Sequence, residues 1–134
     1  MRLFYKGLFG AILAATPAVA QEEQGIQDAI GGQLEAFVAR DTSRAFSYAS
    51  PFIKRLFDTP ENFGMMVEQG YPMVWDNSNV RFLDRDVRGG LIYQKVLMRG
   101  PEGATHVVEY EMIETPQGWQ INGVRLIPAP DVAA

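Results

Sequence analysis

Apolar residues in the first half of the chain recur at intervals of three and four, which is the spacing of one face of an α-helix. A first helix is predicted over residues 26–39, with these side chains on its buried face: Ile26, Ile30, Leu34, Phe37 and Val38. Gly31 and Gly32 fall inside this helix, where each costs about 1 kcal/mol relative to Ala. Either another segment packs closely against that turn or the helix bends there, and we expect the close packing.

Three segments that begin with capping residues follow the first helix. Asp41 or Thr42 can cap a second helix. The pair Ser50-Pro51 starts a short apolar turn or two, because Ser caps a helix and Pro fits its first position. The same device predicts a third helix over residues 59–69.

Beyond Trp75 the pattern changes to the two-residue alternation of β-strands. Four strands are predicted, over residues 80–87, 91–99, 105–114 and 118–127. Short turn-forming segments separate them, which makes neighbouring strands antiparallel. Helices followed by a sheet predict an α+β fold, in which about three N-terminal helices pack on one face of a curved four-strand antiparallel sheet.

The two ends of the chain have patterns of their own. Arg2 and Lys6 precede a short apolar run that ends in a small-x-small motif at Ala20, so residues 1–20 are predicted to be a cleaved signal peptide. The apolar run is shorter than the ~20 residues of a spanning helix, which favours a cleaved leader over a membrane anchor. The protein is then periplasmic or secreted, and no stable membrane span is expected after the leader is removed. Residues 21–25 are predicted to be a flexible start and residues 128–134 a disordered tail.

Composition excludes several classes of chemistry. The chain has no Cys and one His, so thiol catalysis, iron–sulfur clusters and thiolate zinc sites are impossible. We find no phosphate-binding glycine motif and no calcium loop in the sequence, and we expect no cofactor and no metal. The leader holds two of the 12 basic residues and none of the 16 acidic ones, so the remainder carries a net charge of −6. That charge disfavours nucleic acid and anionic membrane surfaces as partners.

Two family resemblances extend this picture. The order of elements, together with the segment GWQINGV at 118–124, resembles the nuclear-transport-factor-2-like superfamily, which implies a single cone-like α+β domain over residues 26–127. The segments at 49–51, 59–64, 70–75 and 110–116 resemble an uncharacterised bacterial family of small exported proteins, a domain of unknown function. The superfamily includes isomerases, dehydratases, binders and assembly modules, and fold alone does not choose among them.

The cone implied by this resemblance suggests a ligand pocket. Side chains from its helices and its concave sheet face enclose a cavity, and Tyr and Trp offer an apolar body with a polar tip that suits a small organic ligand. The predicted pocket residues are Tyr48, Phe63, Tyr71, Trp75, Tyr93, Tyr110 and Trp119. The alternative is an ordinary core that fills the cone completely.

No catalytic residue is assigned, and the candidates for an acid or base are His106, Tyr110 and Glu111. Strand alternation puts Tyr110 on the apolar, buried face of its strand and puts Glu109 and Glu111 on the opposite face. We therefore expect both glutamates to face solvent or a partner subunit and to form cross-strand ion pairs. The alternative is a general acid and base inside a cavity, with Arg125 as a charge partner.

Three functions fit these observations. The first is a non-catalytic module that binds a small apolar or aromatic molecule and forms a homodimer through the open sheet face. The second is a protein–protein assembly module that uses residues 72–75 as an exposed apolar contact. The third is a cofactor-independent isomerase or lyase. Many aromatic residues without a convergent catalytic set favour the first.

Overall fold

The computed structural model describes residues 16–128. Within this range five helices precede four strands: α1 (Pro17–Val38), α2 (Thr42–Ser47), α3 (Pro51–Phe57), α4 (Pro60–Gly70), α5 (Pro72–Trp75), β1 (Ser78–Arg88), β2 (Leu91–Arg99), β3 (Thr105–Thr115) and β4 (Gly118–Ile127). The strands form one antiparallel sheet in the order β1-β2-β3-β4. The predicted α+β class and the predicted antiparallel sheet are confirmed.

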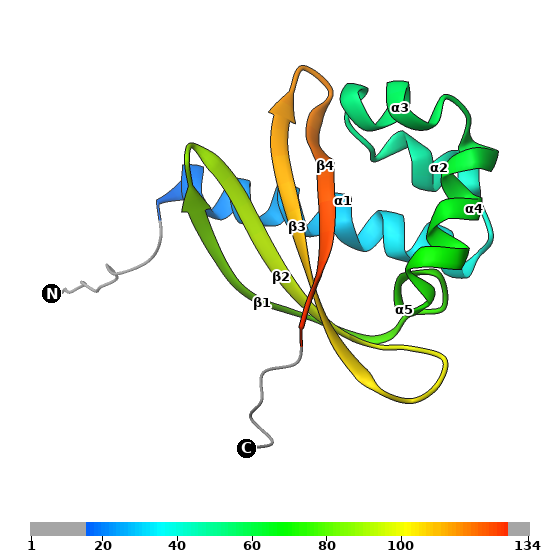
Figure 1. Ribbon diagram of the computed structural model, residues 1–134. Coiled ribbons are helices and arrows are strands. Elements are labelled where there is room, and N and C mark those ends of the chain that lie inside the picture. The colour runs from blue at the N-terminus through cyan, green and yellow to red at the C-terminus, as the bar shows by residue number, and fades with distance from the viewer. Residues whose placement is uncertain (1–15, 129–134) are drawn as a thin grey trace, which may run out of the picture.

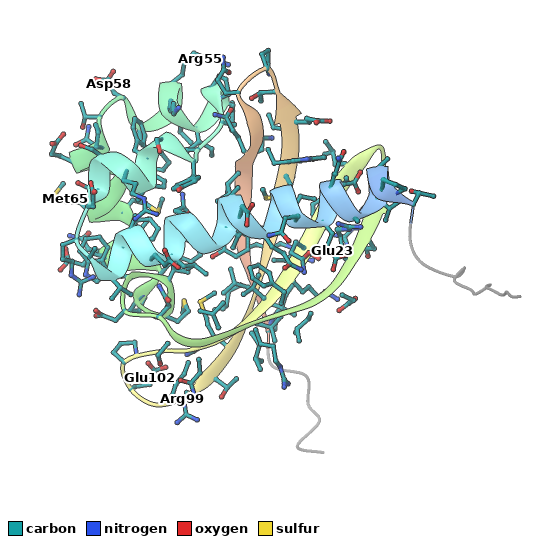
Figure 2. The ribbon with its side chains drawn as sticks, turned by 180° about the vertical axis from the view of Figure 1, so that it is seen from behind. Glu23, Arg55, Asp58, Met65, Arg99 and Glu102 are labelled. Carbon is teal, nitrogen blue, oxygen red and sulfur yellow. The ribbon has the colours of Figure 1, made fainter. Side chains whose placement is uncertain are left out.

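The helices are unevenly distributed over the sheet. α1 crosses one face of it, and α2 to α5 gather around the C-terminal half of α1, with α3 beside β4 (Figure 1). From the opposite side α1 lies across the strands in full view (Figure 2). The other face of the sheet carries no helix among the described residues (Figure 1).

Three helix starts use one local device. The hydroxyl oxygens of Thr16, Ser50 and Thr59 accept hydrogen bonds from backbone N–H groups in the first turns of α1, α3 and α4, at 3.2, 3.3 and 3.1 Å. A Pro follows each of them at the first helical position. The hydroxyl oxygen pairs with a backbone N–H that has no partner within the helix, and Pro fixes the backbone angle φ near its helical value. Together they explain why the chain can start a new helix after each short break.

α1 begins well before the predicted start at Ile26. Residues 21–25, predicted to be flexible, are helical, because the cap at Thr16 starts the helix upstream of them. Gln24 donates to Asp28 at 2.7 Å along this polar stretch, and Glu22 pairs with Arg85 of β1 at 3.7 Å. Apolar periodicity marks only the part of a helix that is buried, so it gave a start that was too late.

The helices number five in the described range where about three were predicted. The short apolar turn predicted after Ser50 is the helix α3, and the segment after Pro72 forms the single turn α5. Met73 and Val74 of α5 are only 6% and 4% exposed. The prediction that residues 72–75 form an exposed apolar contact is therefore wrong for these two side chains, which belong to the core.

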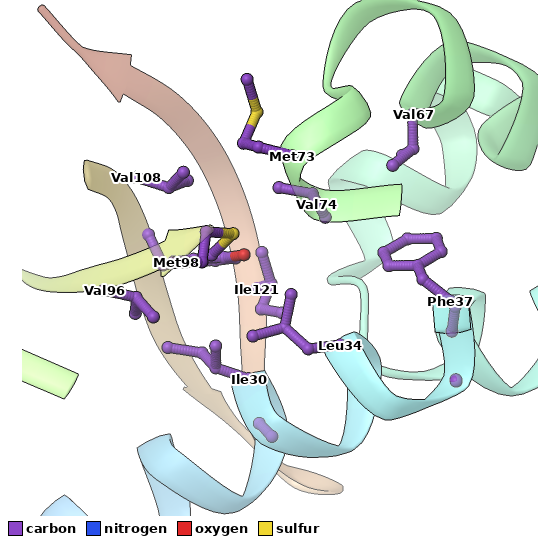
Figure 3. Close-up of a cluster of buried hydrophobic side chains, with 14 of the residues drawn as sticks. Ile30, Leu34, Phe37, Val67, Met73, Val74, Val96, Met98, Val108 and Ile121 are labelled. Carbon is purple, nitrogen blue, oxygen red and sulfur yellow. The ribbon is translucent and has the colours of Figure 1, made fainter. Parts of the chain in front are cut away.

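The core lies between α1 and the sheet. On β3, Val108, Tyr110 and Met112 are all buried, as the alternation predicted. Figure 3 shows side chains of α1 reaching toward side chains of the strands and of α5. The contributors include Ile30, Leu34 and Phe37 from α1, Val74 from α5, and Val96, Met98, Val108 and Ile121 from the strands. This packing fixes α1 against the sheet and leaves α3 at the margin.

Both predicted terminal segments fall largely outside the described residues. These are residues 1–15 of the predicted signal peptide and residues 129–134 of the predicted tail. Between residues 16 and 128 no helix has the combination of length and apolar character that crossing a membrane requires.

Candidate functional site

A cavity of about 300 Å³ is walled by all of the helices except α2 and, on the sheet side, by β3 and β4. Its lining is aliphatic and aromatic apart from Gln33, Tyr71, Tyr110 and Asn122, and it contains no charged residue. Small-molecule pockets measure about 300–1,000 Å³, and a cavity of about 150 Å³ already admits benzene. The cavity therefore has room for a small organic molecule.

The hydroxyl group of Tyr110 is the unusual feature of this cavity. Tyr110 is completely buried, and its hydroxyl oxygen has no hydrogen-bond partner. Burial raises the pKa of the Tyr110 phenol above its ordinary value, so the group stays protonated at neutral pH. A buried hydroxyl without a partner costs about 1–3 kcal/mol, and it is available to hydrogen-bond a bound molecule.

The other polar groups around the cavity are already engaged. Gln33 Nε2 donates to the carbonyl of Ala45 at 3.1 Å, and the Tyr71 hydroxyl donates to the carbonyl of Val124 at 3.3 Å. Asn122 Nδ2 donates to Glu111 Oε2 at 2.7 Å. These bonds hold the walls in place and leave Tyr110 as the polar wall group without a partner among them.

α3 forms the exposed wall of the cavity. Its four apolar side chains line the cavity: Phe52, Ile53, Leu56 and Phe57. Yet Phe52 is 53% and Leu56 is 62% exposed, and no residue of α3 is fully buried. The N-terminal end of α3 is anchored by Ser50, which donates its backbone N–H to the carbonyl of Ile121 at 2.8 Å and its hydroxyl to Asn122 Oδ1 at 2.7 Å. Of the helices that wall the cavity, α3 is the one without a buried residue, and this part of the lining is called the thin wall.

Three of the seven predicted pocket residues, Phe63, Tyr71 and Tyr110, line this cavity. Two others, Tyr48 and Trp119, line a separate groove beside α1. The sequence could assign aromatic residues to a pocket, but it did not show which wall each of them would face.

The remaining two predicted pocket residues lie under arginine side chains. The Arg40 guanidinium lies 4.4 Å from the ring centroid of Trp75, and it also forms an ion pair with Asp76. The Arg88 guanidinium lies 4.0 Å from the ring centroid of Tyr93, on the face of the sheet opposite α1. Neither aromatic residue lines the cavity.

Sequence reasoning missed Gln33 and Asn122 as wall residues. Gln33 follows Ile30 by three residues, so helical spacing places it on the apolar face of α1, and the sequence could have indicated its burial. In the structure it is 2% exposed. Asn122 falls where the β3–β4 register shifts between Glu111 and Met112. Such a bulge changes the direction in which a side chain points, and no pattern in this sequence predicted it.

The prediction that Glu109 faces solvent is wrong. Its side chain is 1% exposed, because Arg88 and Arg125 cover it, each with a nitrogen 2.9 Å from Glu109 Oε1. Arg125 stands opposite Glu109 in the β3–β4 register, so the two form a cross-strand ion pair. Burial alone would raise the pKa of Glu109, but the hydrogen bonds from the two guanidinium groups outweigh it and hold that pKa below its ordinary value.

The catalytic candidates do not meet in one place. Glu111 Oε1 accepts a long hydrogen bond from Tyr93 at 3.5 Å on the face of the sheet opposite the cavity. His106 Nε2 lies 2.6 Å from Glu102 Oε2 beside the β2–β3 turn, and this bond holds the pKa of Glu102 below its ordinary value. Tyr110 alone lines the cavity.

Comparison with protein families gives one match. Residues 19–134 correspond to a domain of unknown function (DUF4864). The chain belongs to this family. No curated protein and no solved structure matches it. The match spans nearly all of the described residues, so the cavity, the thin wall formed by α3 and the open sheet face all lie inside the DUF4864 domain.

The DUF4864 domain offers hydrogen bonding and apolar contact at its cavity rather than charge. Within residues 16–128 no three His, Asp or Glu side chains are grouped so that they could hold a metal ion. The Tyr110 phenol is protonated at neutral pH, so it serves as a hydrogen-bond donor or acceptor and not as a base. The arrangement can bind and orient a neutral molecule.

Proposed function

We propose that this domain binds a small uncharged molecule, mostly apolar and with one hydrogen-bonding group, in the cavity between α3, α4 and β4. The proposal is carried by two observations: Tyr110 lines an otherwise apolar cavity, and its buried hydroxyl has no hydrogen-bond partner. A ligand atom that pairs with this hydroxyl removes the cost of leaving it unpaired, whereas an apolar ligand leaves that cost in place.

The cavity favours a neutral ligand over an ion. Transferring a charge into a site without a counter-charge costs far more than transferring a neutral polar group. None of the residues that line the cavity is ionised, and the paired acid Glu109 lies on the other face of the sheet. Carboxylates, phosphates and amines are therefore poor ligands for this site.

The thin wall formed by α3 supports a route of entry. α3 is held at its N-terminal end by Ser50, while its apolar side chains are only partly covered. Elements with few buried contacts open at low free-energy cost. Displacement of α3 about its Ser50 end, with loss of the hydrogen bond from Asn62 Nδ2 to the carbonyl of Phe57, admits a ligand without disturbing the core between α1 and the sheet.

The test is an NMR titration with two molecules of nearly equal shape, 4-ethylphenol and 4-ethyltoluene, and with 4-ethylbenzoate anion as the charged member. We expect the phenol to bind about tenfold more tightly than the hydrocarbon, since one hydrogen bond is worth about 1.4 kcal/mol. We expect the carboxylate not to bind. Equal affinity of phenol and hydrocarbon would show that Tyr110 does not select the ligand.

A matched pair of variants assigns the binding to the cavity. Val67 is 4% exposed in the cavity wall, and Val38 is 53% exposed on α1 outside it. Val67→Phe should abolish phenol binding, whereas Val38→Phe should leave it unchanged. Phenol binding that survives in a folded Val67→Phe variant would place the site elsewhere and end the proposal.

Two further proposals concern where the protein is located and which known folds it is related to. We propose that the chain is exported, on the basis of Arg2, Lys6 and the motif ending at Ala20, and N-terminal sequencing of the protein from cells should begin at Gln21. An unprocessed N-terminus would refute this.

We also propose kinship with the cone-shaped nuclear-transport-factor-2-like folds, which the order of helices and antiparallel strands supports.

A further inference from the structure

A second hollow, of about 190 Å³, lies on the open sheet face, which is the face that no described helix covers. Three strands line it, with Tyr93 from β2, Glu109 and Glu111 from β3, and Gly123, Val124 and Arg125 from β4. In the strand register Tyr93 stands opposite Glu111, and Arg125 stands opposite Glu109. Residues two apart on a strand, and residues directly opposite across strands, share a face. These four side chains therefore point to the same side of the sheet.

Glu109 supplies a buried and unpaired oxygen atom in this hollow. Its side chain is 1% exposed, and its Oε1 accepts from both Arg88 and Arg125 at 2.9 Å. Its Oε2 has no hydrogen-bond partner. Nearly all buried polar atoms in proteins are paired, so this oxygen is an exception that needs an explanation. A donor on a bound molecule would satisfy it.

Glu111 supplies a second carboxylate, and its own partners are neutral. Its Oε2 accepts from Asn122 Nδ2 at 2.7 Å, and its Oε1 accepts from the Tyr93 hydroxyl at 3.5 Å. Between residues 16 and 128 no Lys, Arg or His forms an ion pair with it. The bond from Tyr93 is at the upper limit of hydrogen-bond length, so Oε1 keeps capacity for a stronger donor. A cationic donor placed between the two glutamates forms charge-assisted bonds with both.

Arg125 offers the opposite charge at the edge of the same hollow. Among the described residues its side chain makes one hydrogen bond, from Nε to Glu109, and it is 62% exposed. The N–H groups on its two terminal nitrogens remain available, and their fork geometry matches a carboxylate. The hollow therefore presents two carboxylates beside one guanidinium edge.

Gly123 keeps the hollow open beside Glu111. The two residues stand opposite each other in the β3–β4 register. A Cβ added at Gly123 would lie 3.7 Å from Glu111 Cβ and 3.8 Å from Glu111 Oε1, which are ordinary contact distances. A side chain at this position therefore fits the fold but takes up the space next to the carboxylate.

From these observations we infer that the hollow binds a free α-amino acid in its zwitterionic form. The ammonium group donates to Glu109 Oε2 and Glu111 Oε1, and the carboxylate accepts from the terminal nitrogens of Arg125. Glu111 and Arg125 are diagonal neighbours on adjacent strands, about 7–8 Å apart, which one α-amino acid spans with a hydrogen bond at each end.

The charges of the hollow select against ligands that carry only one of these groups. An amine without a carboxylate meets the positive charge of Arg125, and an acid without an ammonium group meets the two glutamates. The hollow and the cavity lie on opposite faces of the sheet, so amino-acid binding goes beyond the proposed cavity function.

The test follows the Gly123 amide and the Arg125 Nε–H by NMR during titration with L-leucine. L-leucinamide lacks the carboxylate, and N-acetyl-L-leucine lacks the ammonium group. The dipeptide leucyl-leucine keeps both charges but holds them further apart, which distinguishes a free amino acid from a peptide. We expect saturable shifts with L-leucine and about tenfold weaker binding of each of the other three, since each loses a charge-assisted hydrogen bond.

Matched variants assign this binding to the hollow. Glu111→Gln should weaken L-leucine binding about tenfold. Glu114→Gln removes the same charge from an exposed position of β3 outside the hollow, and it should bind as the wild type does. Gly123→Val should abolish binding, with the amide spectrum of the other strands showing that it is folded. Val67→Phe, which fills the cavity, should leave L-leucine binding unchanged, so the two sites can fail separately.

Three results would overturn the inference. The first is no saturable shift with L-leucine at about 50 mM, far above a 1 mM dissociation constant. The second is binding of L-leucinamide, N-acetyl-L-leucine or leucyl-leucine as tight as that of L-leucine. The third is wild-type affinity in Glu111→Gln, a substitution that keeps the size of the side chain and removes its charge.

Discussion

Replacing Tyr110 by Phe should stabilise the protein without ligand, although a buried Tyr→Phe substitution usually destabilises. The hydroxyl of Tyr110 is buried and has no partner, so its removal recovers about 1–3 kcal/mol of desolvation cost. The substitution also removes one oxygen atom and its van der Waals contacts, at about 0.1–0.2 kcal/mol for each contact. The net expectation is a gain of about 0.5–2 kcal/mol in the free energy of unfolding.

Urea unfolding followed by circular dichroism measures this gain. With a urea m-value of about 1–3 kcal/mol/M, the midpoint should rise by about 0.2–2 M at unchanged m. The melting temperature should rise by about 2–8 °C, since a domain of this size gains roughly 4 °C per kcal/mol. The same variant should bind 4-ethylphenol no better than 4-ethyltoluene.

Tyr71→Phe is the matched control, because Tyr71 lines the same cavity and its hydroxyl is paired with the carbonyl of Val124. This control should lose about 0.5–1.5 kcal/mol. If Tyr110→Phe is destabilised as much as Tyr71→Phe, the hydroxyl of Tyr110 has a partner in solution, and the reasoning behind the proposed function fails.

Two further predictions follow from the open sheet face and from α1. The pKa of Glu109 is held below its ordinary value, so this carboxylate contributes stability above the ordinary glutamate pKa, and the contribution disappears as the pH falls through the lowered value. Glu109→Gln should therefore unfold at lower urea than the wild type at pH 7, with a smaller difference at about pH 3, and a difference that is the same at both pH values would contradict the ion-pair account. On α1, Gly31→Ala meets no atom within 4 Å and should stabilise by about 0.5–1 kcal/mol, whereas Gly32→Ala meets the Tyr48 ring and should destabilise by about 1–2 kcal/mol. Equal melting temperatures for the two variants would show that Tyr48 does not pack closely against Gly32.

Local patterns predicted the framework of the fold well. The alternation on β3 identified Val108, Tyr110 and Met112 as the buried face, and the two glycines of α1 indicated a close approach that the structure places at Gly32. Each of these inferences depends on one element alone. Side-chain direction along a single strand or helix follows from its period, so the sequence is sufficient to predict it.

The features that the sequence did not predict depend on more than one element. The burial of Glu109 requires Arg88 from β1 and Arg125 from β4 to converge on one carboxylate of β3. The separation of Tyr48 and Trp119 from the cavity depends on how α1 and the β3–β4 hairpin pack together. An aromatic residue type is consistent with either hollow, so composition could indicate a ligand site but could not locate it.

The most direct test of ligand binding in the cavity is an isotope-filtered NMR experiment on the protein saturated with 4-ethylphenol. It detects which protein protons lie close to the bound ligand. The account predicts contacts from the ligand to the methyl groups of Ile53, Met66 and Val67 and to the ring of Tyr110, all in the cavity wall. Contacts confined to the groove of Trp119 or to the open sheet face, or no contacts at saturation, would contradict it.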